Sequence, residues 1–149
     1  MNRTMRALGA LMGMITISIF AQGALAADRP YKEGPVTDVT AVRTQPGHFD
    51  DYMAFLATTY KKEMEAWKAA GLIIGYQVFQ ATPRQPSDAD LYLLVTYKNM
   101  AALDGLAEKM DAIDEKLLGS QAQMNQATID RGKIRTILGD EYIRELILK

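Results

Sequence analysis

Hydrophobic residues recur at helical spacing through the first half of the chain. Between residues 49 and 70, large apolar and aromatic side chains return every three or four positions, which places them on one face of a helix. They are Phe49, Tyr52, Met53, Leu56, Tyr60, Met64 and Trp67. Gly71 follows, and glycine readily adopts the left-handed conformation found at helix ends. The pattern predicts one long helix over residues 49–70.

The second informative stretch joins a strand directly to a helix. Residues 91–97 (LYLLVTY) are leucine-rich, β-branched or aromatic, which is typical of a buried strand. From Met100 to Leu117 the apolar residues take helical spacing. Asn99 lies at the junction, where its side chain can cap the helix. A ligand-binding role for Asn99 at the strand end is the alternative.

Three further strands and another helix complete the expected elements. Residues 36–43, 72–80 and 141–148 have strand-like composition. Ser120 can cap a helix whose spacing continues to Gly139. The order β-α-β-β-α-(α)-β predicts an α+β, ferredoxin-like fold, with four antiparallel strands and helices on one face of the sheet.

One face of such a sheet has no helices over it. Alternation along residues 91–97 puts Tyr92, Leu94 and Thr96 on one side and their neighbours on the other. The pattern does not decide which set meets the helices. Both sets are too apolar for water, so we expect the uncovered face to pack against a second copy and form a homodimer.

Residues 1–26 have the features of a secretory signal peptide. Arg3 and Arg6 form a positive n-region, Ala7 to Phe20 an apolar core, and Ala24-Leu25-Ala26 an A-x-A cleavage site. We predict cleavage after Ala26 and a periplasmic or secreted protein without a stable membrane span. The alternative is an uncleaved membrane anchor. Spanning a bilayer takes roughly 20 apolar residues, and the apolar core from Ala7 to Phe20 is shorter than that.

The rest of the chain divides into a leader and one domain. Residues 27–35 contain Pro30, Gly34 and Pro35, which predicts a flexible leader. Residues 36–149 are predicted to form a single dimeric α/β-barrel-like domain, long enough for one hydrophobic core.

Composition narrows the chemistry. The chain has no cysteine, which excludes disulfides, thiolate metal sites and a lipoprotein anchor. It has 17 basic and 18 acidic residues, so we expect no nucleic-acid partner. His48 is the single histidine, which excludes a multi-histidine site. No phosphate loop or HExxH motif is present, and we expect neither a metal nor a cofactor.

Two segments resemble the dimeric α/β-barrel superfamily, which includes antibiotic-biosynthesis monooxygenases, EthD-like and NIPSNAP-like proteins. They are residues 42–52, where a strand leads through Pro-Gly into an acidic helix start, and residues 92–103. The chain is also similar to small exported bacterial proteins of unknown function that share the run at residues 97–106 and the Arg-Glu-Leu ending. The resemblance implies a barrel-like dimer and a ligand cleft between sheet and helices.

The resemblance does not imply a particular catalytic group, because these groups differ between branches. The haem-degrading branch uses an Asn, a Trp and a His in a set arrangement. Here the only tryptophan, Trp67, falls on the first predicted helix, and the first predicted strand has no asparagine. None of those roles is therefore transferred to this chain.

Two residues are candidates for catalysis. His48 could transfer a proton or bind haem at the helix start, and the alternative is a solvent-facing helix-entry residue. Tyr92 could supply a second polar group. Asp50 and Asp51 do not form a carboxylate pair, since adjacent helical residues point about 100° apart, and they suit the positive end of the helix dipole.

Aromatic residues are numerous and could line a ligand pocket between helix and sheet. Core packing with hydroxyls at the rim is the alternative. The candidate ligand-binding residues are Tyr52, Trp67, Tyr76, Tyr92 and Asn99, with Tyr60 and Tyr97 in the same aromatic set.

Charged residues give two weaker candidates. Arg131 and Arg135, with Arg144 and Glu145, could form an anion site, and ion pairs with Asp130, Asp140 or Glu141 are the alternative. Asp111, Asp114 and Glu115 could bind a hard cation, but no calcium-type loop surrounds them. A solvated helix face accounts for these three residues.

Three functions remain open. The first is binding of a small apolar or aromatic ligand, and the second is a cofactor-independent oxygenase or isomerase that uses His48 and the tyrosines. The third is a structural or stress-related envelope protein. A cavity of roughly 300 Å³ or more favours a ligand, whereas a filled interior favours association alone.

Overall fold

The computed structural model describes residues 29–149, and the predicted signal peptide (1–26) and residues 27 and 28 lie outside this range. The elements in chain order are β1 (Tyr31–Thr44), α1 (Phe49–Phe55), the π-helical turn η1 (Leu56–Tyr60), α2 (Lys61–Ala69), β2 (Gly75–Gln80), β3 (Leu91–Tyr97), the 3₁₀ turn η2 (Met100–Leu103), α3 (Leu106–Leu118), α4 (Gln121–Gly132) and β4 (Arg135–Leu148).

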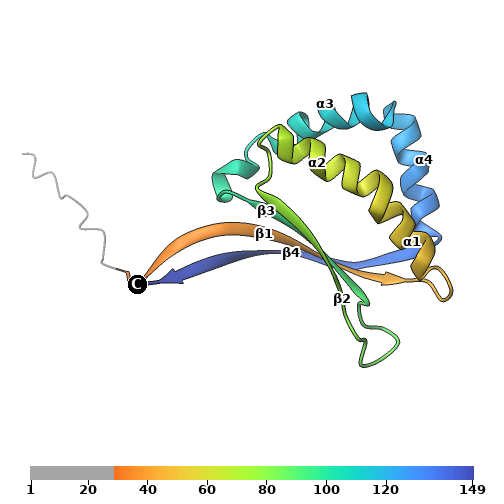
Figure 1. The fold of residues 1–149 in the computed structure, drawn as a ribbon, viewed down its shortest axis with the longest axis horizontal. Coiled ribbons are helices and arrows are strands. Elements are labelled where there is room, and N and C mark those ends of the chain that lie inside the picture. Colours follow the sequence, from red (N-terminus) through yellow and green to blue (C-terminus); the bar gives the residue numbers. More distant parts are fainter. Residues whose placement is uncertain (1–28) are drawn as a thin grey trace, which may run out of the picture.

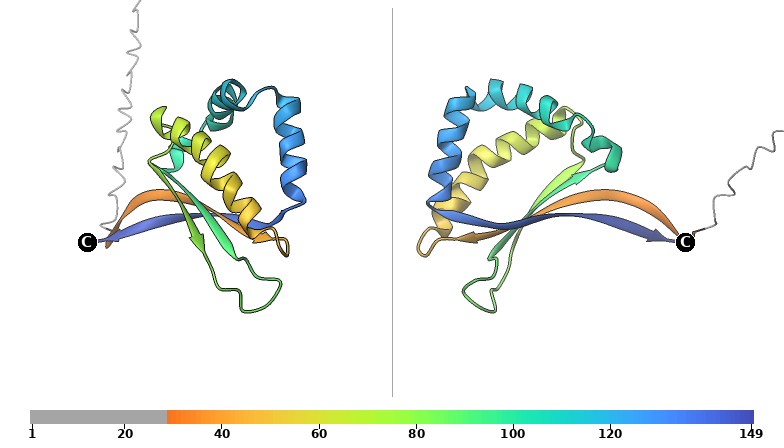
Figure 2. Two further views of the ribbon diagram at one scale, coloured as in Figure 1. Left: turned by 45° about the vertical axis from the view of Figure 1, so that its right-hand side comes forward. Right: turned by 180° about the vertical axis from the view of Figure 1, so that it is seen from behind.

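The sheet has four antiparallel strands in the order β2-β3-β1-β4. All the helices lie over one face of it, and α3 and α4 arch above α1 and α2 (Figures 1 and 2). The two central strands are joined to the edge strands by helical crossovers, which is the connectivity of a ferredoxin-like fold. The predicted α+β, ferredoxin-like architecture is confirmed.

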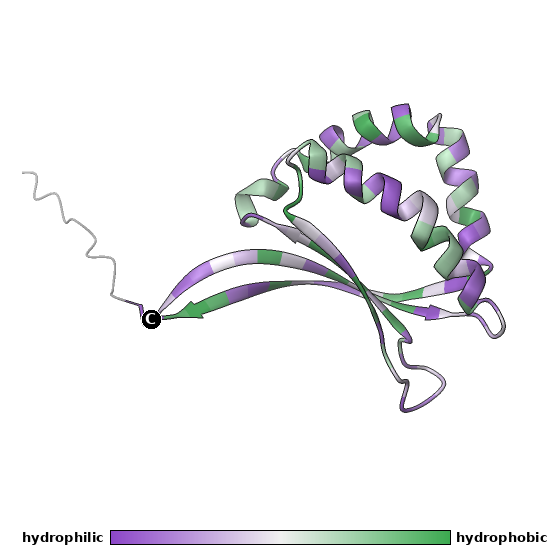
Figure 3. Ribbon diagram, in the orientation of Figure 1, coloured by the Kyte–Doolittle hydropathy of each residue, from purple (hydrophilic) through white to green (hydrophobic). Residues whose placement is uncertain are grey.

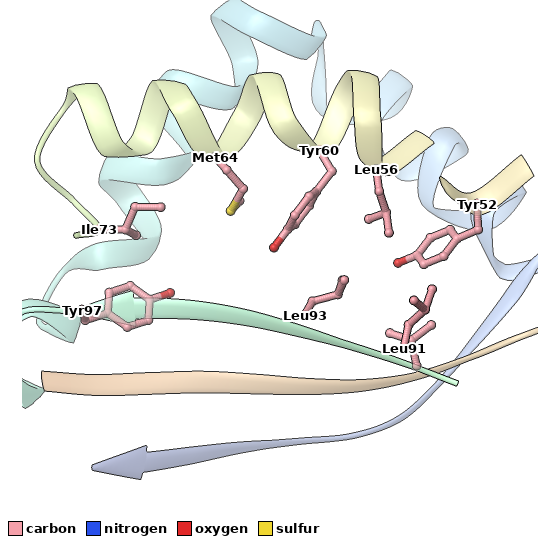
Figure 4. Packing of buried hydrophobic residues seen from close by; sticks show 9 residues of the cluster. Tyr52, Leu56, Tyr60, Met64, Ile73, Leu91, Leu93 and Tyr97 are labelled. Atoms are coloured by element: carbon pink, nitrogen blue, oxygen red, sulfur yellow. The ribbon is translucent and has the colours of Figure 1, made fainter. Parts of the chain in front are cut away.

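The long helix predicted over residues 49–70 is continuous but changes its winding. It runs through α1, η1 and α2, with a π-helical turn at Leu56–Tyr60. Buried residues follow a repeat of four: Tyr52, Leu56, Tyr60 and Met64. On an α-helix a repeat of four drifts by about 40° at each step. The wider π turn counteracts this drift, so the four side chains keep facing the sheet (Figure 4).

The main core lies between this helix and β3. Leu91, Leu93 and Tyr97 are buried against the helix side chains, together with Val42 of β1 and Ile73 of the α2–β2 connection. The odd-numbered residues of β3 therefore face the helices, which answers the question that the alternation in the sequence left open. Tyr92 lies on the opposite face and is 37% exposed.

The first and last strands along the chain are longer than the sequence pattern predicts. β1 begins at Tyr31 instead of Val36, and β4 begins at Arg135 instead of Glu141. A shift of register between Glu33 and Val36 accommodates Gly34 and Pro35, because proline has no N–H for the ladder and is tolerated at a bulge. Part of the expected flexible leader is therefore paired strand. The paired ends of β1 and β4 project beyond the helices (Figure 1).

Other element boundaries differ for local reasons. The helix predicted from Met100 is divided into η2 and α3 by Gly105, which has a φ of +60°. The helix predicted to reach Gly139 ends at Gly132, and the chain then enters β4. Asn99 accepts a hydrogen bond from the Ala102 N–H at 3.1 Å, and Ser120 forms a capping box with Gln123. Both predicted caps are confirmed.

The face of the sheet opposite the helices is uncovered and apolar. Phe79 of β2, Tyr92 of β3 and Ile143 of β4 are all more than one third exposed there. Hydrophobic segments alternate with polar positions along the strands that carry them (Figure 3). Among residues 29–149, no helix is both long enough and apolar enough to cross a membrane.

Candidate functional site

A cavity of about 550 Å³ lies between the helical layer and the sheet. Its aromatic wall comes from the long helix, with contributions from Tyr52, Phe55, Tyr60 and Trp67, and from Tyr97 of β3. Figure 4 shows Tyr60 pointing from the helix toward the sheet, between Leu56 and Met64.

Three buried polar atoms of the described residues lack a hydrogen-bond partner, and all three belong to residues that line this cavity. They are Oδ1 of Asp38, the hydroxyl of Tyr60 and Nε of Arg135. A buried polar group without a partner costs about 1–3 kcal/mol. Three such atoms around one cavity therefore mark it as a place where a polar ligand or water can complete the hydrogen bonding.

One end of the cavity is cationic. Arg131 of α4 lies 4.8 Å from the ring centre of Phe55, and Arg135 of β4 lies 5.6 Å from that of Tyr52. Arg131 also donates a hydrogen bond to the hydroxyl of Thr128 at 2.8 Å. Burial and the neighbouring Arg135 charge lower the pKa of Arg131. Burial raises the pKa of Tyr52, and the two arginines oppose that shift.

A carboxyl group lies beside the cationic end. Burial, followed by repulsion from Asp114 of α3, raises the pKa of Glu63 to about 7, and the Arg131 charge opposes this shift. Asp114 is only 8% exposed and accepts a hydrogen bond from the Trp67 indole N–H at 2.8 Å. The prediction that Asp114 lies on a solvated helix face is wrong, because it is covered where α3 packs against α2.

The opposite end of the cavity is acidic and phenolic. Burial raises the pKa of Asp38, and repulsion from Asp140 adds to the effect. Burial, then the Asp38 charge, raises the pKa of Tyr97 to about 12. Tyr142 also lines this end. The cavity therefore has opposite electrostatic character at its two ends.

Glu63 gives the fold a testable dependence on pH. Its pKa is raised from 4.5 to about 7 on folding, so the folded state binds the proton more tightly than the unfolded state. The free energy of unfolding therefore falls as pH rises from about 4.5 to 7, and the loss is complete above pH 7. Glu63→Gln is expected to raise the melting temperature by several degrees at pH 8 and to change it little at pH 4.

Thermal melts at the two pH values measure this effect. The matched control is Glu115→Gln, since Glu115 is exposed on α3 and should give no such difference between pH 4 and pH 8. An equal effect of Glu63→Gln at both pH values would mean that charge burial at Glu63 does not limit stability.

The structure brings together some of the residues chosen from sequence. Tyr52 and Trp67 line the cavity. Tyr76 faces the same side of the sheet and packs edge-on against Tyr60, with 6.1 Å between ring centres. Its hydroxyl donates to Glu65 at 2.7 Å, at the outer side of the helix and outside the cavity lining.

The other chosen residues lie elsewhere. Tyr92 borders a shallow depression of about 210 Å³ on the opposite face of the sheet, with Val39 and Leu138. Asn99 caps η2. The side chain of His48 is 45% exposed, and its Nδ1 lies 2.7 Å from an Asp51 carboxylate oxygen. His48, Tyr92 and Asn99 are thus separated from the cavity and from one another.

The sequence reasoning missed Asp38 and Glu63. Asp38 is on the same face of β1 as Val36 and Val42, which are fully buried. A carboxylate on the core-facing side of a strand is unusual and indicates a candidate functional residue. Glu63 lies four residues before Trp67 on the helix, so the two share a face. Both signals were present in the sequence.

The two arginines were considered from sequence, with two outcomes left open. Within residues 29–149, neither Arg131 nor Arg135 forms an ion pair with a carboxylate. Asp130 instead pairs with Lys133 at 2.6 Å. Arg144 pairs with Glu33 at 2.6 Å and, like Glu145, does not line the cavity.

A second cavity of about 590 Å³ adjoins the first. It lies between η1 and the α3–α4 junction and shares Phe55, Glu63 and Arg131 with the first cavity. These three side chains therefore separate the two spaces. Among the described residues, no cluster of three or more His, Cys, Asp or Glu side chains could hold a metal ion.

Comparison with known proteins gives distant structural similarity alone. No family model matches the chain, and no curated protein matches it. HapK from Hahella chejuensis has a TM-score of 0.48 at 10% identity, covering 74% of this chain and 91% of HapK. Two dimeric ferredoxin-like proteins from uncultured marine organisms have TM-scores of 0.47 and 0.46 at 8% and 11% identity. Each alignment covers 79% of this chain, with 90% and 98% of the two proteins. The fold assignment therefore rests on the strand order and connections of this chain.

Proposed function

We propose that this protein is exported and, as a homodimer, binds a small aromatic ligand in the helix–sheet cavity. The observation that carries the proposal is a cavity of about 550 Å³ with aromatic walls and three polar atoms that have no hydrogen-bond partner among residues 29–149. Small-molecule sites usually measure about 300–1,000 Å³ and combine apolar walls with a few polar groups that orient the ligand.

The walls favour an aromatic ligand over a purely aliphatic one. Phe55 and Trp67 belong to the long helix and Tyr97 belongs to β3, and all three line the cavity. Aromatic rings attract one another in offset or edge-to-face arrangements, beyond the contribution of buried area. The hydroxyl of Tyr60, which has no partner among the described residues, would donate to a polar substituent on the ligand.

Export and dimerisation have separate support. The charged, apolar and A-x-A segments of residues 1–26 fit a signal peptide. The uncovered sheet face carries Phe79, Tyr92 and Ile143, and an apolar face of this kind usually meets a partner. A two-fold interface uses the same surface of both copies, so this single face is sufficient for a dimer.

Native mass spectrometry of protein released from the periplasm of its own cells tests the proposal. The expected result is a dimer of chains that begin at Ala27, with a discrete small adduct. A dimer without an adduct, even after incubation with aromatic compounds, would contradict ligand binding. Recovery only from the cytoplasm would contradict export, and a monomer would contradict dimerisation.

The second candidate is a cofactor-independent oxygenase or isomerase acting on such a ligand. The observation that favours it is Glu63, whose pKa of about 7 suits a group that accepts and returns a proton. In the same experiment, an adduct that changes in mass or structure after incubation would favour catalysis, whereas an unchanged adduct favours binding alone.

A further inference from the structure

Two arginines of the cavity, which form no ion pair with a carboxylate among residues 29–149, indicate the charge of its ligand. Arg131 and Arg135 come from α4 and β4, on either side of a short connection. No carboxylate among residues 29–149 forms an ion pair with either one, and Nε of Arg135 is buried without a hydrogen-bond partner. Guanidinium groups in proteins favour the fork-shaped pairing with a carboxylate.

The two charges also repel each other. Arg135 is one of the causes that lower the pKa of Arg131, and the Glu63 carboxyl beside Arg131 opposes this effect. Because burial raises the pKa of Glu63 to about 7, this carboxyl is only partly ionised at neutral pH. The arginine pair is therefore a local concentration of positive charge that Glu63 offsets in part. An anion between the two groups would relieve this repulsion and satisfy Arg135 Nε. The guanidinium group of Arg131 lies over the ring of Phe55, and that of Arg135 lies over the ring of Tyr52. Attraction between a cation and an aromatic face helps to keep both groups in place.

The acidic end of the cavity is too distant to neutralise this pair. Along β1, Asp38 lies opposite Tyr142 and Thr44 lies opposite Arg135. Six residues of extended strand correspond to about 20 Å. A carboxylate group on a ligand would therefore be attracted to the arginine end of the cavity. Asp38 would disfavour a negative group at the other end.

We propose that the ligand of this cavity is an aromatic carboxylate whose carboxylate group is bound by Arg135 and Arg131. Its ring lies among Tyr52, Phe55 and Tyr60, between the long helix and the sheet. This inference rests on the proposed function, which requires only an aromatic ligand and does not specify its charge. It adds a direction of binding, with the anionic group toward the start of β4.

Isothermal titration calorimetry with two matched probes tests the inference. The probes are 2-naphthoate and 2-naphthamide, which have similar size and differ in charge. We expect 2-naphthoate to bind at least tenfold more tightly, since hydrogen bonds to a charged group contribute about 1.5–3 kcal/mol. Arg135→Gln is expected to remove this preference while leaving the affinity for 2-naphthamide within about twofold.

Controls separate charge from folding and from general electrostatics. Arg84→Gln removes a positive charge from the exposed β2–β3 loop, outside the cavity, and should leave both affinities unchanged. Arg131→Gln tests the same anion site from α4 and should weaken binding of 2-naphthoate alone. Arg135→Lys keeps the positive charge but lacks the two parallel donors of the guanidinium group. Its affinity for 2-naphthoate should lie between those of the wild type and Arg135→Gln. Thermal melts verify that each variant is folded.

The outcomes distinguish the two proposals. Equal affinity for the two probes, or an Arg135→Gln variant that still prefers 2-naphthoate, would overturn the anion site and leave an aromatic ligand site intact. Failure of both probes to bind the wild-type protein would overturn the aromatic carboxylate and count against the proposed function as well.

Discussion

Replacing Leu91 with alanine is expected to lower the free energy of unfolding by about 2–5 kcal/mol. Leu91 is 1% exposed and belongs to the main core, and it pairs with Val42 on β1 and with Gln80 on β2. Truncation would remove buried apolar surface and leave a space that the helix above and the strands on both sides cannot fill.

Urea unfolding followed by circular dichroism measures this change, at one fixed protein concentration. The matched control is Ile129→Ala on α4, because Ile129 is 61% exposed and its truncation should change stability by less than about 0.5 kcal/mol. A loss below about 1 kcal/mol for Leu91→Ala would mean that the helix and sheet do not pack closely at this point.

The double substitution of Tyr92→Lys and Ile143→Lys is expected to convert the proposed dimer into a folded monomer. Both residues are exposed on the uncovered sheet face and lie on different strands, so the two charges would span much of the interface. Burying an unpaired ammonium group costs several kcal/mol, which is a large fraction of the binding energy of a typical dimer.

Light scattering coupled to size-exclusion chromatography measures the mass of both proteins. Ile129→Lys is the control, since it adds a charge at an exposed helix position away from the sheet and should leave the dimer intact. A double variant that remains dimeric would show that the copies meet through another surface. A monomeric wild type would show that this sheet face stays free.

The repeating patterns predicted the architecture because burial on a helix or strand obeys a fixed period. The stripe through Tyr52, Leu56 and Met64 predicted the long helix, and the alternation along residues 91–97 divided β3 into two faces. Neither pattern could predict which face of β3 meets the helices. That depends on the side of the sheet on which the crossover helices pack. In the structure they cover Leu91 and leave Tyr92 on the uncovered face.

The cavity was harder to predict, because its polar groups come from four separate elements. Asp38, Glu63, Arg131 and Arg135 belong to β1, α2, α4 and β4. The sequence raised the two arginines as a possible anion site, but ion pairs with nearby carboxylates were the favoured interpretation. Lys133 pairs with Asp130, and the entry into β4 at Arg135 leaves the two guanidinium groups turned toward the helix–sheet space.

The π-helical turn at Leu56–Tyr60 also makes this part of the chain tolerant of one change in length. A chain with one residue fewer between Phe55 and Lys61 could close the turn as a regular α-helix. Tyr52 and Met64 would then be eleven residues apart, and eleven residues of α-helix turn by about 1,100°, which is within about 20° of three full turns. Met64 would therefore still face the sheet. The turn thus accommodates one extra residue without changing the buried face, and a homologous chain with the same cavity and a regular helix should align here with a gap of one residue.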